Sequence, residues 1–439
     1  MSSLRDRLPA PLRRIAGAVL KVLPESLVAL VLPDELGFRP ADVVRPVPAP
    51  TAPVRLYVAP VNFAGQGYRW ARAARLLPGV GATSMQYRTA TDFGFPADDS
   101  LPVAVFVHSR RWGRWQADRV LHGYTHVLVE AERPVLGRSY GLDLRREVAA
   151  LRAAGVSVGL VSHGSDLRLP SRHLAREPWS PFGDPGWELA RRLEEQALEN
   201  ARIVAELGAP VFVSTPDLLL DAPDATWLPV VVDPQAWGAR RPVDLRARPV
   251  VVHAPSRGPM KGTAHVDAAL SPLHEAGTIE YRQVTGVPAD EMPGVYTAAD
   301  IVVDQVVLGL YGVAAVEAMA AGRLVVGHVS EQVRAHVRRT TGLDVPVLEA
   351  TPDTLAAVVE GVLARPEAHE ILAARGPAFV AAVHDGRFSA EVLAPFLGVD
   401  VVATPDESAR GDARQDDTGQ DDGVHHHGGL PDDTEEGAR

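Results

Sequence analysis

One segment around residue 310 constrains the fold of this chain more than any other. It reads Gly-Leu-Tyr-Gly-Val-Ala-Ala-Val-Glu-Ala-Met-Ala-Ala-Gly-Arg-Leu-Val-Val over residues 309–326. The glycines predict a tight turn into a short helix that ends at Gly322 and precedes a buried strand, Leu324–Gly327. The first backbone N–H groups of such a helix, from Gly312 to Ala315, lack intrahelical partners and attract anions. Because the carboxylate of Glu317 can accept hydrogen bonds from ribose hydroxyls, the segment suits a diphosphate attached to a sugar.

Apolar strands that alternate with helices run through most of the chain. This pattern predicts an α/β protein with two Rossmann-like, doubly wound parallel sheets that face each other across a cleft. In the first half we expect buried strands over Val54–Ala59, Val103–Val107, His126–Glu130, Val156–Val161 and Val211–Ser214. In the second half we expect strands over Pro249–His253, Tyr281–Val287 and Leu324–Gly327, and helices near residues 368–382 and 387–397.

Changes in composition indicate where the domains begin and end. Closely spaced prolines precede residue 54, and apolar periodicity stops near residue 402, where acidic and polar residues dominate. A segment of that composition cannot bury enough surface to order itself. We therefore expect an N-terminal basic and apolar arm with a proline-rich linker (1–53), a first domain (54–236), a second domain (237–385), a C-terminal helix (386–401) and a disordered acidic tail (402–439).

Composition excludes several classes of protein. The formal net charge of −11 argues against a nucleic-acid-binding surface. The chain has no cysteine, so disulfides, thiolate catalysis and cysteine-ligated zinc are excluded. No apolar run is long enough to span a membrane, and no signal peptide is evident, which favours a cytoplasmic protein.

Residues 10–31 mix basic and apolar side chains at helical spacing. One interpretation is a helix that lies on the anionic inner face of a membrane, which would make the protein peripheral. The alternatives are a helix that packs on the body of the protein and an arm that binds a partner. The sequence leaves the three interpretations open.

The segment 309–326 resembles the signature of the family 4-like (group 1) retaining glycosyltransferases of the GT-B fold, which include sucrose synthases and bacterial mannosyltransferases. Their motif reads roughly E-G-F-G-x-x-x-x-E-A-M-A-x-G-x-P-V. Tyr311 and Gly312 fill its F-G positions, and residues 317–322 match its second half. The first glutamate is replaced by Gly309, eight residues before Glu317. In the family that glutamate contacts the donor sugar, so the replacement bears on sugar choice and on turnover.

The resemblance implies a nucleotide-sugar site made by both domains, with the first domain (54–236) on the acceptor side, the second (237–385) binding the donor and the helix 386–401 crossing back to the first domain. The segment His253–Thr263 resembles the diphosphate-binding segment of the family, in which cations stabilise the leaving nucleotide without a bound metal. Arg168 would help to orient the sugar or the acceptor. The implied donor-binding residues are Gly65, Gln66, Gly67, Arg257, Lys261, Val287, Tyr311, Gly312, Val313, Ala314 and Glu317. The implied catalytic residues are His163, Asp166, Lys261 and Glu317.

The function implied by the resemblance is transfer of a sugar, with retention and without metal, in polysaccharide or glycoconjugate biosynthesis. The nucleotide-sugar is a co-substrate and no further cofactor is expected. A lipid-linked glycan, a cell-wall polymer and a small metabolite all stay open as acceptors. A second hypothesis is a catalytically silent GT-B protein that binds nucleotide or glycan as a partner subunit, because Gly309 replaces the glutamate. A third is a sugar-nucleotide epimerase, which requires acid–base carboxylates in the cleft.

Overall fold

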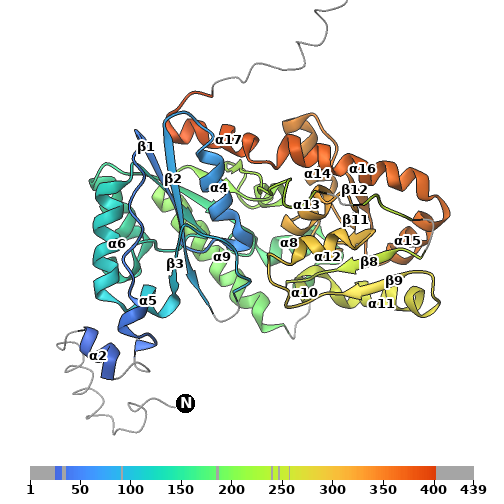
Figure 1. Ribbon diagram of the computed structural model, residues 1–439, viewed down its shortest axis with the longest axis horizontal. Coiled ribbons are helices and arrows are strands. Elements are labelled where there is room, and N and C mark those ends of the chain that lie inside the picture. Colours follow the sequence, from blue (N-terminus) through green and yellow to red (C-terminus); the bar gives the residue numbers. More distant parts are fainter. Residues whose placement is uncertain are drawn as a thin grey trace, which may run out of the picture. The chain divides into compact units, whose positions relative to one another are not determined.

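The computed structural model describes residues 25–31, 36–89, 92–183, 187–238, 241–245, 248–256 and 258–401. Two parallel sheets dominate this part of the chain, and helices lie on both faces of each (Figure 1). The predicted α/β fold with two doubly wound sheets is therefore confirmed. The predicted tail and the residues of the N-terminal arm before Glu25 lie outside the described residues.

The first domain contains a seven-stranded sheet in the order β3-β2-β1-β4-β5-β6-β7. Its strands are β1 (Val54–Ala59), β2 (Val80–Arg88), β3 (Asp99–Pro102), β4 (His126–Glu130), β5 (Ser157–Ser162), β6 (Val211–Val213) and β7 (Thr226–Trp227). Strands β1, β4, β5 and β6 fall where the apolar runs predict them, within one residue at each end. The other three were not predicted, because β3 and β7 are short and the sequence of β2 mixes polar residues with apolar ones.

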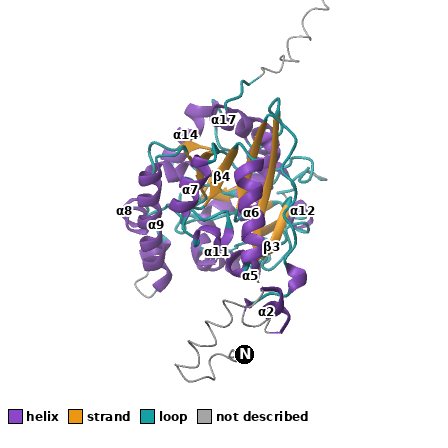
Figure 2. Ribbon diagram, turned by 90° about the vertical axis from the view of Figure 1, so that its left-hand side faces the viewer, coloured by secondary structure: helices purple, strands orange, loops and turns teal. Residues whose placement is uncertain are grey.

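The alternation of side chains along these strands explains the layers. On one face, Leu56 and Val58 pack with helices α4 (Gln66–Ala74) and α17 (Arg387–Leu397). On the other face, Tyr57 and Ala59 pack with a second layer of helices (Figure 2). That layer consists of α5 (Val103–His108), α6 (Arg110–Gly123), α7 (Leu144–Ala153) and α9 (Glu188–Leu207). The remaining helices that precede the second sheet are α2 (Glu25–Val31) and α8 (Pro170–Arg176).

The predicted strand over Val103–Val107 is wrong, because these residues form helix α5. A short apolar run fits a buried strand and a buried helix equally well, so its periodicity does not decide between them. Here β3 already supplies the edge of the sheet and ends at Pro102, which has no N–H group to donate. Val105 and Phe106 then face the core from the helix, while their neighbours are only partly buried.

The second domain contains a five-stranded sheet in the order β12-β11-β10-β8-β9. Its strands are β8 (Val250–His253), β9 (Glu280–Gln283), β10 (Ile301–Val303), β11 (Leu324–Gly327) and β12 (Val347–Glu349). Its helices are α10 (Gly258–Lys261), α11 (Thr263–Glu275), α12 (Met292–Thr297), α13 (Val313–Ala320), α14 (Glu331–Thr341), α15 (Leu355–Ala364) and α16 (Pro366–Val383). Strands β8 and β11 agree with the prediction. The predicted strand Tyr281–Val287 is confirmed only up to Gln283, and a loop follows.

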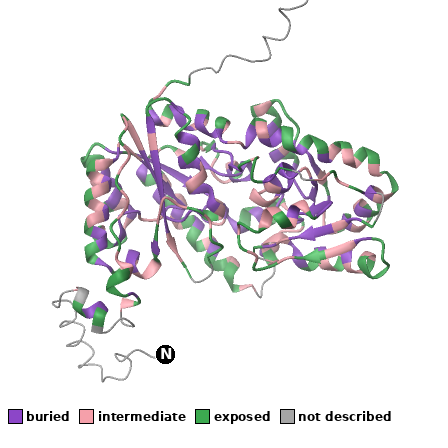
Figure 3. Cartoon of the chain, viewed as in Figure 1, coloured by how far each residue is buried: buried purple, intermediate pink, exposed green. Residues whose placement is uncertain are grey.

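The two domains share buried surface at several points. Helix α17 follows the second sheet in the sequence but packs on α4 of the first domain, where Leu393 is fully buried. In the opposite direction, Phe182 and Leu193 from the first half pack in the core of the second sheet. Buried residues follow both sheets, and exposed residues cover the outer helices (Figure 3).

Candidate functional site

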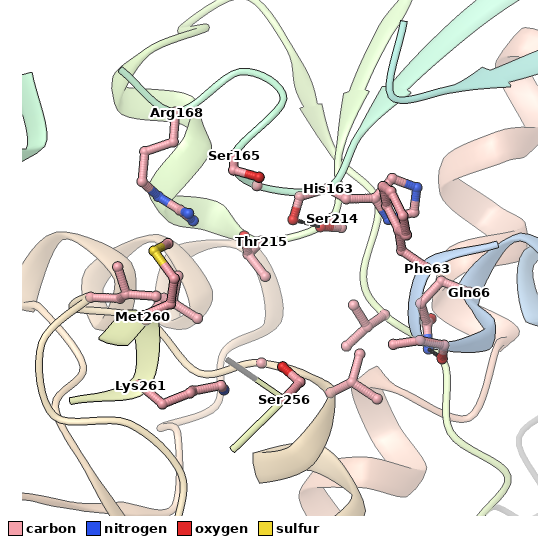
Figure 4. Close-up of a pocket in the computed structure, with 17 residues that line it drawn as sticks. Phe63, Gln66, His163, Ser165, Arg168, Ser214, Thr215, Ser256, Met260 and Lys261 are labelled. Carbon is pink, nitrogen blue, oxygen red and sulfur yellow. Dashed lines mark hydrogen bonds between the residues drawn. The ribbon is translucent and has the colours of Figure 1, made fainter. Parts of the chain in front are cut away.

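A pocket of about 240 Å³ lies at the carboxyl ends of strands from both sheets. We call one side the first-domain wall, which comprises Phe63, Ala64, Gln66, His163, Gly164, Ser165, Arg168, Ser214 and Thr215. We call the other the second-domain wall, which comprises Ser256, Met260, Lys261, Leu308, Leu310, Gly312 and Val313. Figure 4 shows Arg168 and Ser165 on one side and Met260 and Lys261 on the other.

The position of the pocket follows from the order of the strands. In the first sheet the order in which successive strands are added reverses between β1 and β4, and in the second sheet it reverses between β8 and β10. Open α/β sheets bind ligands in the crevice at such points, beyond the carboxyl ends of the strands. The loops after β1, β8 and β10 all contribute to the lining of the pocket.

The second-domain wall contains an anion-binding arrangement. Helix α13 begins after Gly312, and the N–H groups of its first turn lack intrahelical partners. The ammonium of Lys261 lies beside this helix end, and its Nζ donates to Oδ1 of Asp304 at 2.5 Å. The N–H of Gly312 donates to Oδ2 of the same carboxylate at 3.3 Å. Two positive groups thus converge on one side of the pocket.

Gln305 fixes the loop that forms this wall. Its side-chain amide is fully buried and donates to the carbonyls of Leu310 and His328. Its Oε1 accepts from the N–H groups of Val307 and Leu308, at 3.0 and 2.6 Å. The sequence analysis assigned no role to Gln305. A polar side chain directly after the buried strand β10 is the signal that could have identified it.

Glu317 lies about one turn into α13, on its partly buried side. Among the described residues its carboxylate has no hydrogen bond or ion pair. Burial raises the pKa of Glu317 to about 8, and the neighbouring charge of Asp304 adds to the rise, while Arg69 and Lys261 oppose it. The carboxyl group therefore carries a proton over much of the neutral range. A group that is half-buried and unpaired is available to a ligand.

The first-domain wall is held by bonds within the protein. Asp166 accepts from the N–H groups of His163 and Gly164, at 2.7 and 2.5 Å, and so closes the loop after β5. Arg168 donates to Oδ2 of Asp217 through Nε and Nη2, at 3.0 and 2.6 Å. Both members of this ion pair are buried. These charges therefore have partners before any ligand arrives.

His163 lies in the same wall, beside the rings of Phe63 and Trp70. Its Nε2 is 3.2 Å from Oε1 of Glu130 at the end of β4, although neither atom has a hydrogen-bond partner among the described residues. The other oxygen of Glu130 accepts from the N–H groups of Val61 and Asn62, at 3.2 and 3.0 Å. Glu130 thus links the loop after β1 to the histidine, a role that the sequence analysis missed.

The loop after β1 adopts an unusual backbone conformation. Asn62 and Ala64 have φ values of 53° and 49°, a region that residues other than glycine rarely occupy. The side-chain amide of Gln66 bonds to both the N–H and the carbonyl of Val231, so it joins this loop to the chain between the domains. At Gly67 a Cβ atom would lie only 2.7 Å from Oε2 of Glu130, which explains why glycine is required there.

The predicted site residues divide into those that line the pocket and those that do not. The predicted residues that line it are Gln66, His163, Lys261, Gly312 and Val313. The predicted residues outside the lining are Gly65, Gly67, Asp166, Val287, Tyr311, Ala314 and Glu317. Tyr311 is buried against Phe379 and His384 in the core. Arg257 lies outside the described residues.

Gly309, which stands where the family motif has its first glutamate, is closed off by a carboxylate from the first domain. Its φ is +67°, and a Cβ there would lie 2.6 Å from Oε1 of Glu177. Oε2 of Glu177 is 3.0 Å from Nε2 of His328, whose Nδ1 is 2.6 Å from Oε1 of Glu349. Burial alone would lower the pKa of His328, but the hydrogen bonds to Glu177 and Glu349 raise it to about 9. The charged ring thus connects the two domains beside Gly309.

Comparison with known proteins identifies the fold. No family model matches the sequence, and no curated protein matches it. HepE of Anabaena, crystallised with UDP and glucose, has a TM-score of 0.50 and 14% identity over 78% of this chain and 98% of its own. WaaG, a glycosyltransferase involved in lipopolysaccharide biosynthesis, has a TM-score of 0.49 and 13% identity over 78% and 99%. Sucrose-phosphate synthase from Thermosynechococcus elongatus has a TM-score of 0.48 and 14% identity over 77% of this chain and 97% of its own. With its two doubly wound sheets, the chain has the GT-B fold.

Among the described residues, no helix combines the length and the apolar character needed to cross a bilayer.

Proposed function

We propose that this protein is a glycosyltransferase that takes a sugar from a nucleotide-sugar donor. The observation that carries the proposal is the second-domain wall, where Lys261 and the start of α13 converge at a pocket and Glu317 follows in the same helix. A diphosphate needs cations and N–H donors, and a ribose needs a hydrogen-bonding carboxyl group. The structure of HepE holds UDP and glucose on the same fold, which supports a donor of this class.

The chemistry that this wall favours is departure of a nucleoside diphosphate. The bond between the anomeric carbon and the phosphate oxygen breaks, and its electron pair stays on that oxygen. Lys261 and the N–H groups of α13 stabilise the charge that develops there, so the step needs no metal. The acceptor hydroxyl forms the new bond on the same face and its proton passes to the phosphate oxygen, which retains the anomeric configuration.

Purified protein incubated with a panel of nucleotide-sugars tests the proposal. We expect slow release of a nucleoside diphosphate from one donor, retained in the presence of EDTA and lost in Lys261→Ala. Binding of a donor without release over many hours, with and without candidate acceptors, would contradict turnover. That result would favour the catalytically silent partner subunit, for which the packing of Glu177 against Gly309 is the specific observation.

The pocket lining argues against an epimerase. Among the described residues that line it there is no Asp or Glu, and epimerisation needs acid–base groups in contact with the sugar. Release of an epimerised sugar in the same assay would reverse this conclusion.

We further propose that the N-terminal arm contacts a membrane that carries the acceptor. Within α2, Leu27 and Leu30 are 46% and 70% exposed, while Glu25 caps the start of α6 through the N–H groups of Arg110 and Arg111. Exposed leucines next to basic residues suit an anionic lipid surface. Sedimentation with anionic vesicles should deplete the full chain and leave a chain lacking residues 1–40 in solution. Equal sedimentation of both would contradict the contact.

A further inference from the structure

Asp304 is an acidic residue that lies directly behind the second-domain wall and contacts its Lys261 and Gly312. It follows β10, and its side chain is nearly buried, with 6% exposure. One carboxylate oxygen accepts from Lys261, and the other accepts from the N–H of Gly312 at the start of α13. An anion thus already bridges the cation and the helix end when no ligand is bound.

The two groups that Asp304 engages are the groups that the proposed function assigns to the donor diphosphate. The N–H of Gly312 has a single proton, and the 3.3 Å bond to Asp304 uses it. Nζ of Lys261 can donate three hydrogen bonds, but its charge is already compensated by the contact at 2.5 Å. A diphosphate that approaches this wall therefore meets engaged donors and a like charge.

Groups other than the carboxylate of Asp304 also hold the loop in place. Gln305 holds residues 307–310, and the backbone N–H of Asp304 bonds to the carbonyl of Val326 in the sheet. The charge of Asp304 also reaches into the site, because it contributes to the raised pKa of Glu317. Its carboxylate therefore changes the charge of the site in addition to bonding the start of α13.

We propose that Asp304 is an internal counter-ion that occupies the place of the donor phosphate and must give up Lys261 and Gly312 before a nucleoside diphosphate binds. The inference rests on the proposed function and deepens it. Competition of this kind lowers the affinity for both substrate and product. Weak binding of the product speeds its release, which limits the turnover of many enzymes.

The test is calorimetric titration of Asp304→Asn with UDP and the other common nucleoside diphosphates, with their uncharged nucleosides and with inorganic diphosphate. Asparagine keeps the shape and removes the negative charge, but it has a single acceptor oxygen, so it can accept from Lys261 or from the N–H of Gly312 and not from both. We expect affinity for nucleoside diphosphates and inorganic diphosphate to rise about tenfold, the equivalent of one pKa unit of charge interaction. Affinity for the nucleosides should not change. Glu360→Gln, which removes an exposed charge from α15 of the same domain, is the matched control and should bind like the wild type.

Each other outcome decides against the inference. Equal or weaker diphosphate binding by Asp304→Asn, with an unchanged melting temperature, would show that the carboxylate supports the site instead of competing for it. Weaker binding only when Mg²⁺ is present would make Asp304 a cation ligand. An equal change in the affinity for nucleosides would indicate that the substitution alters the structure of the site. If neither wild type nor variant binds any nucleoside diphosphate at millimolar concentration, the proposed function fails together with the inference.

Discussion

The two walls of the pocket handle charge in different ways. In the first-domain wall, Arg168 is paired with Asp217, and Asp166 is bonded to backbone N–H groups. In the second domain, Glu317 lies outside the pocket lining and has no partner among the described residues, and Lys261 is paired with a carboxylate, Asp304, that also accepts from a helix end. Buried charges that are already paired are committed to the fold, whereas unpaired groups remain available for a ligand. If the proposed function holds, the contrast predicts that the second domain supplies most of the donor binding energy and that the first gives the pocket its shape.

The largest expected effect falls on the first-domain wall. Arg168→Ala leaves the buried carboxylate of Asp217 without its partner, which should lower the free energy of unfolding by about 3–5 kcal/mol. Arg172→Ala is the matched control, because Arg172 is exposed and lies 3.7 Å from Asp221, so its loss should change stability by less than about 0.5 kcal/mol. Urea unfolding of both variants measures the difference. Equal stability of the two variants would contradict the claim that the buried charge pair in the first-domain wall is committed to the fold.

The second prediction concerns Glu317 and should separate binding from stability. At pH 9, where the carboxyl group is largely ionised, Glu317→Ala should weaken nucleotide-sugar binding by about 1.5–3 kcal/mol, the range for hydrogen bonds to charged groups. It should not lower stability at pH 9, because the pKa of Glu317 is raised to about 8 and the charged form is disfavoured in the folded state. Calorimetry measures the change in binding affinity, and urea unfolding measures the change in stability. Unchanged affinity for the nucleotide-sugar in a variant that is still folded would contradict the role of Glu317 in donor binding.

A smaller effect is expected where the two domains meet beside Gly309. The pKa of His328 is raised to about 9 from an ordinary value of 6.5. A raised folded-state pKa means that the stabilisation is complete below pH 6.5 and is lost as the pH rises through 9. His328→Gln should therefore lower stability by about 1–2 kcal/mol at pH 6 and by much less at pH 10.

The control for this prediction is His369→Gln on α16, where the ring faces a backbone carbonyl instead of carboxylates. Its stability difference from the wild type should not vary between pH 6 and pH 10. A constant deficit in His328→Gln would mean that the ring contributes by packing, for example against Trp179, and not by its charge.

The same contrast explains what the sequence predicted and what it did not. The second-domain wall comes from two short segments, 256–261 and 308–313, and the second of them leads into the predicted helix and the predicted strand Leu324–Gly327 at the expected positions. The first-domain wall depends on pairs that are far apart in the chain, such as Gln66 with Val231 and Glu130 with His163. No local pattern reveals such pairs, because only the folded sheet brings them together. The prediction of a strand over Val103–Val107 was wrong for a related reason. The apolar run allowed both a strand and a helix, and tertiary packing decided between them.

Asp304 is a residue whose role a sequence motif does not reveal. The resemblance draws attention to the residues that match, and Asp304 lies just before the motif, after the strand Ile301–Val303. Its importance follows only from the 2.5 Å contact with Lys261 and the bond to Gly312.

Hydrogen–deuterium exchange with and without a nucleoside diphosphate tests the central claim most directly. The first-turn N–H groups of α13 have no intrahelical partners, so they should exchange quickly in the ligand-free protein. Binding should protect the peptide that covers residues 312–316, while the peptide over residues 163–168 should change little because its N–H groups are already bonded. Protection confined to residues 63–67 and 163–168, with none at the start of α13, would contradict the account.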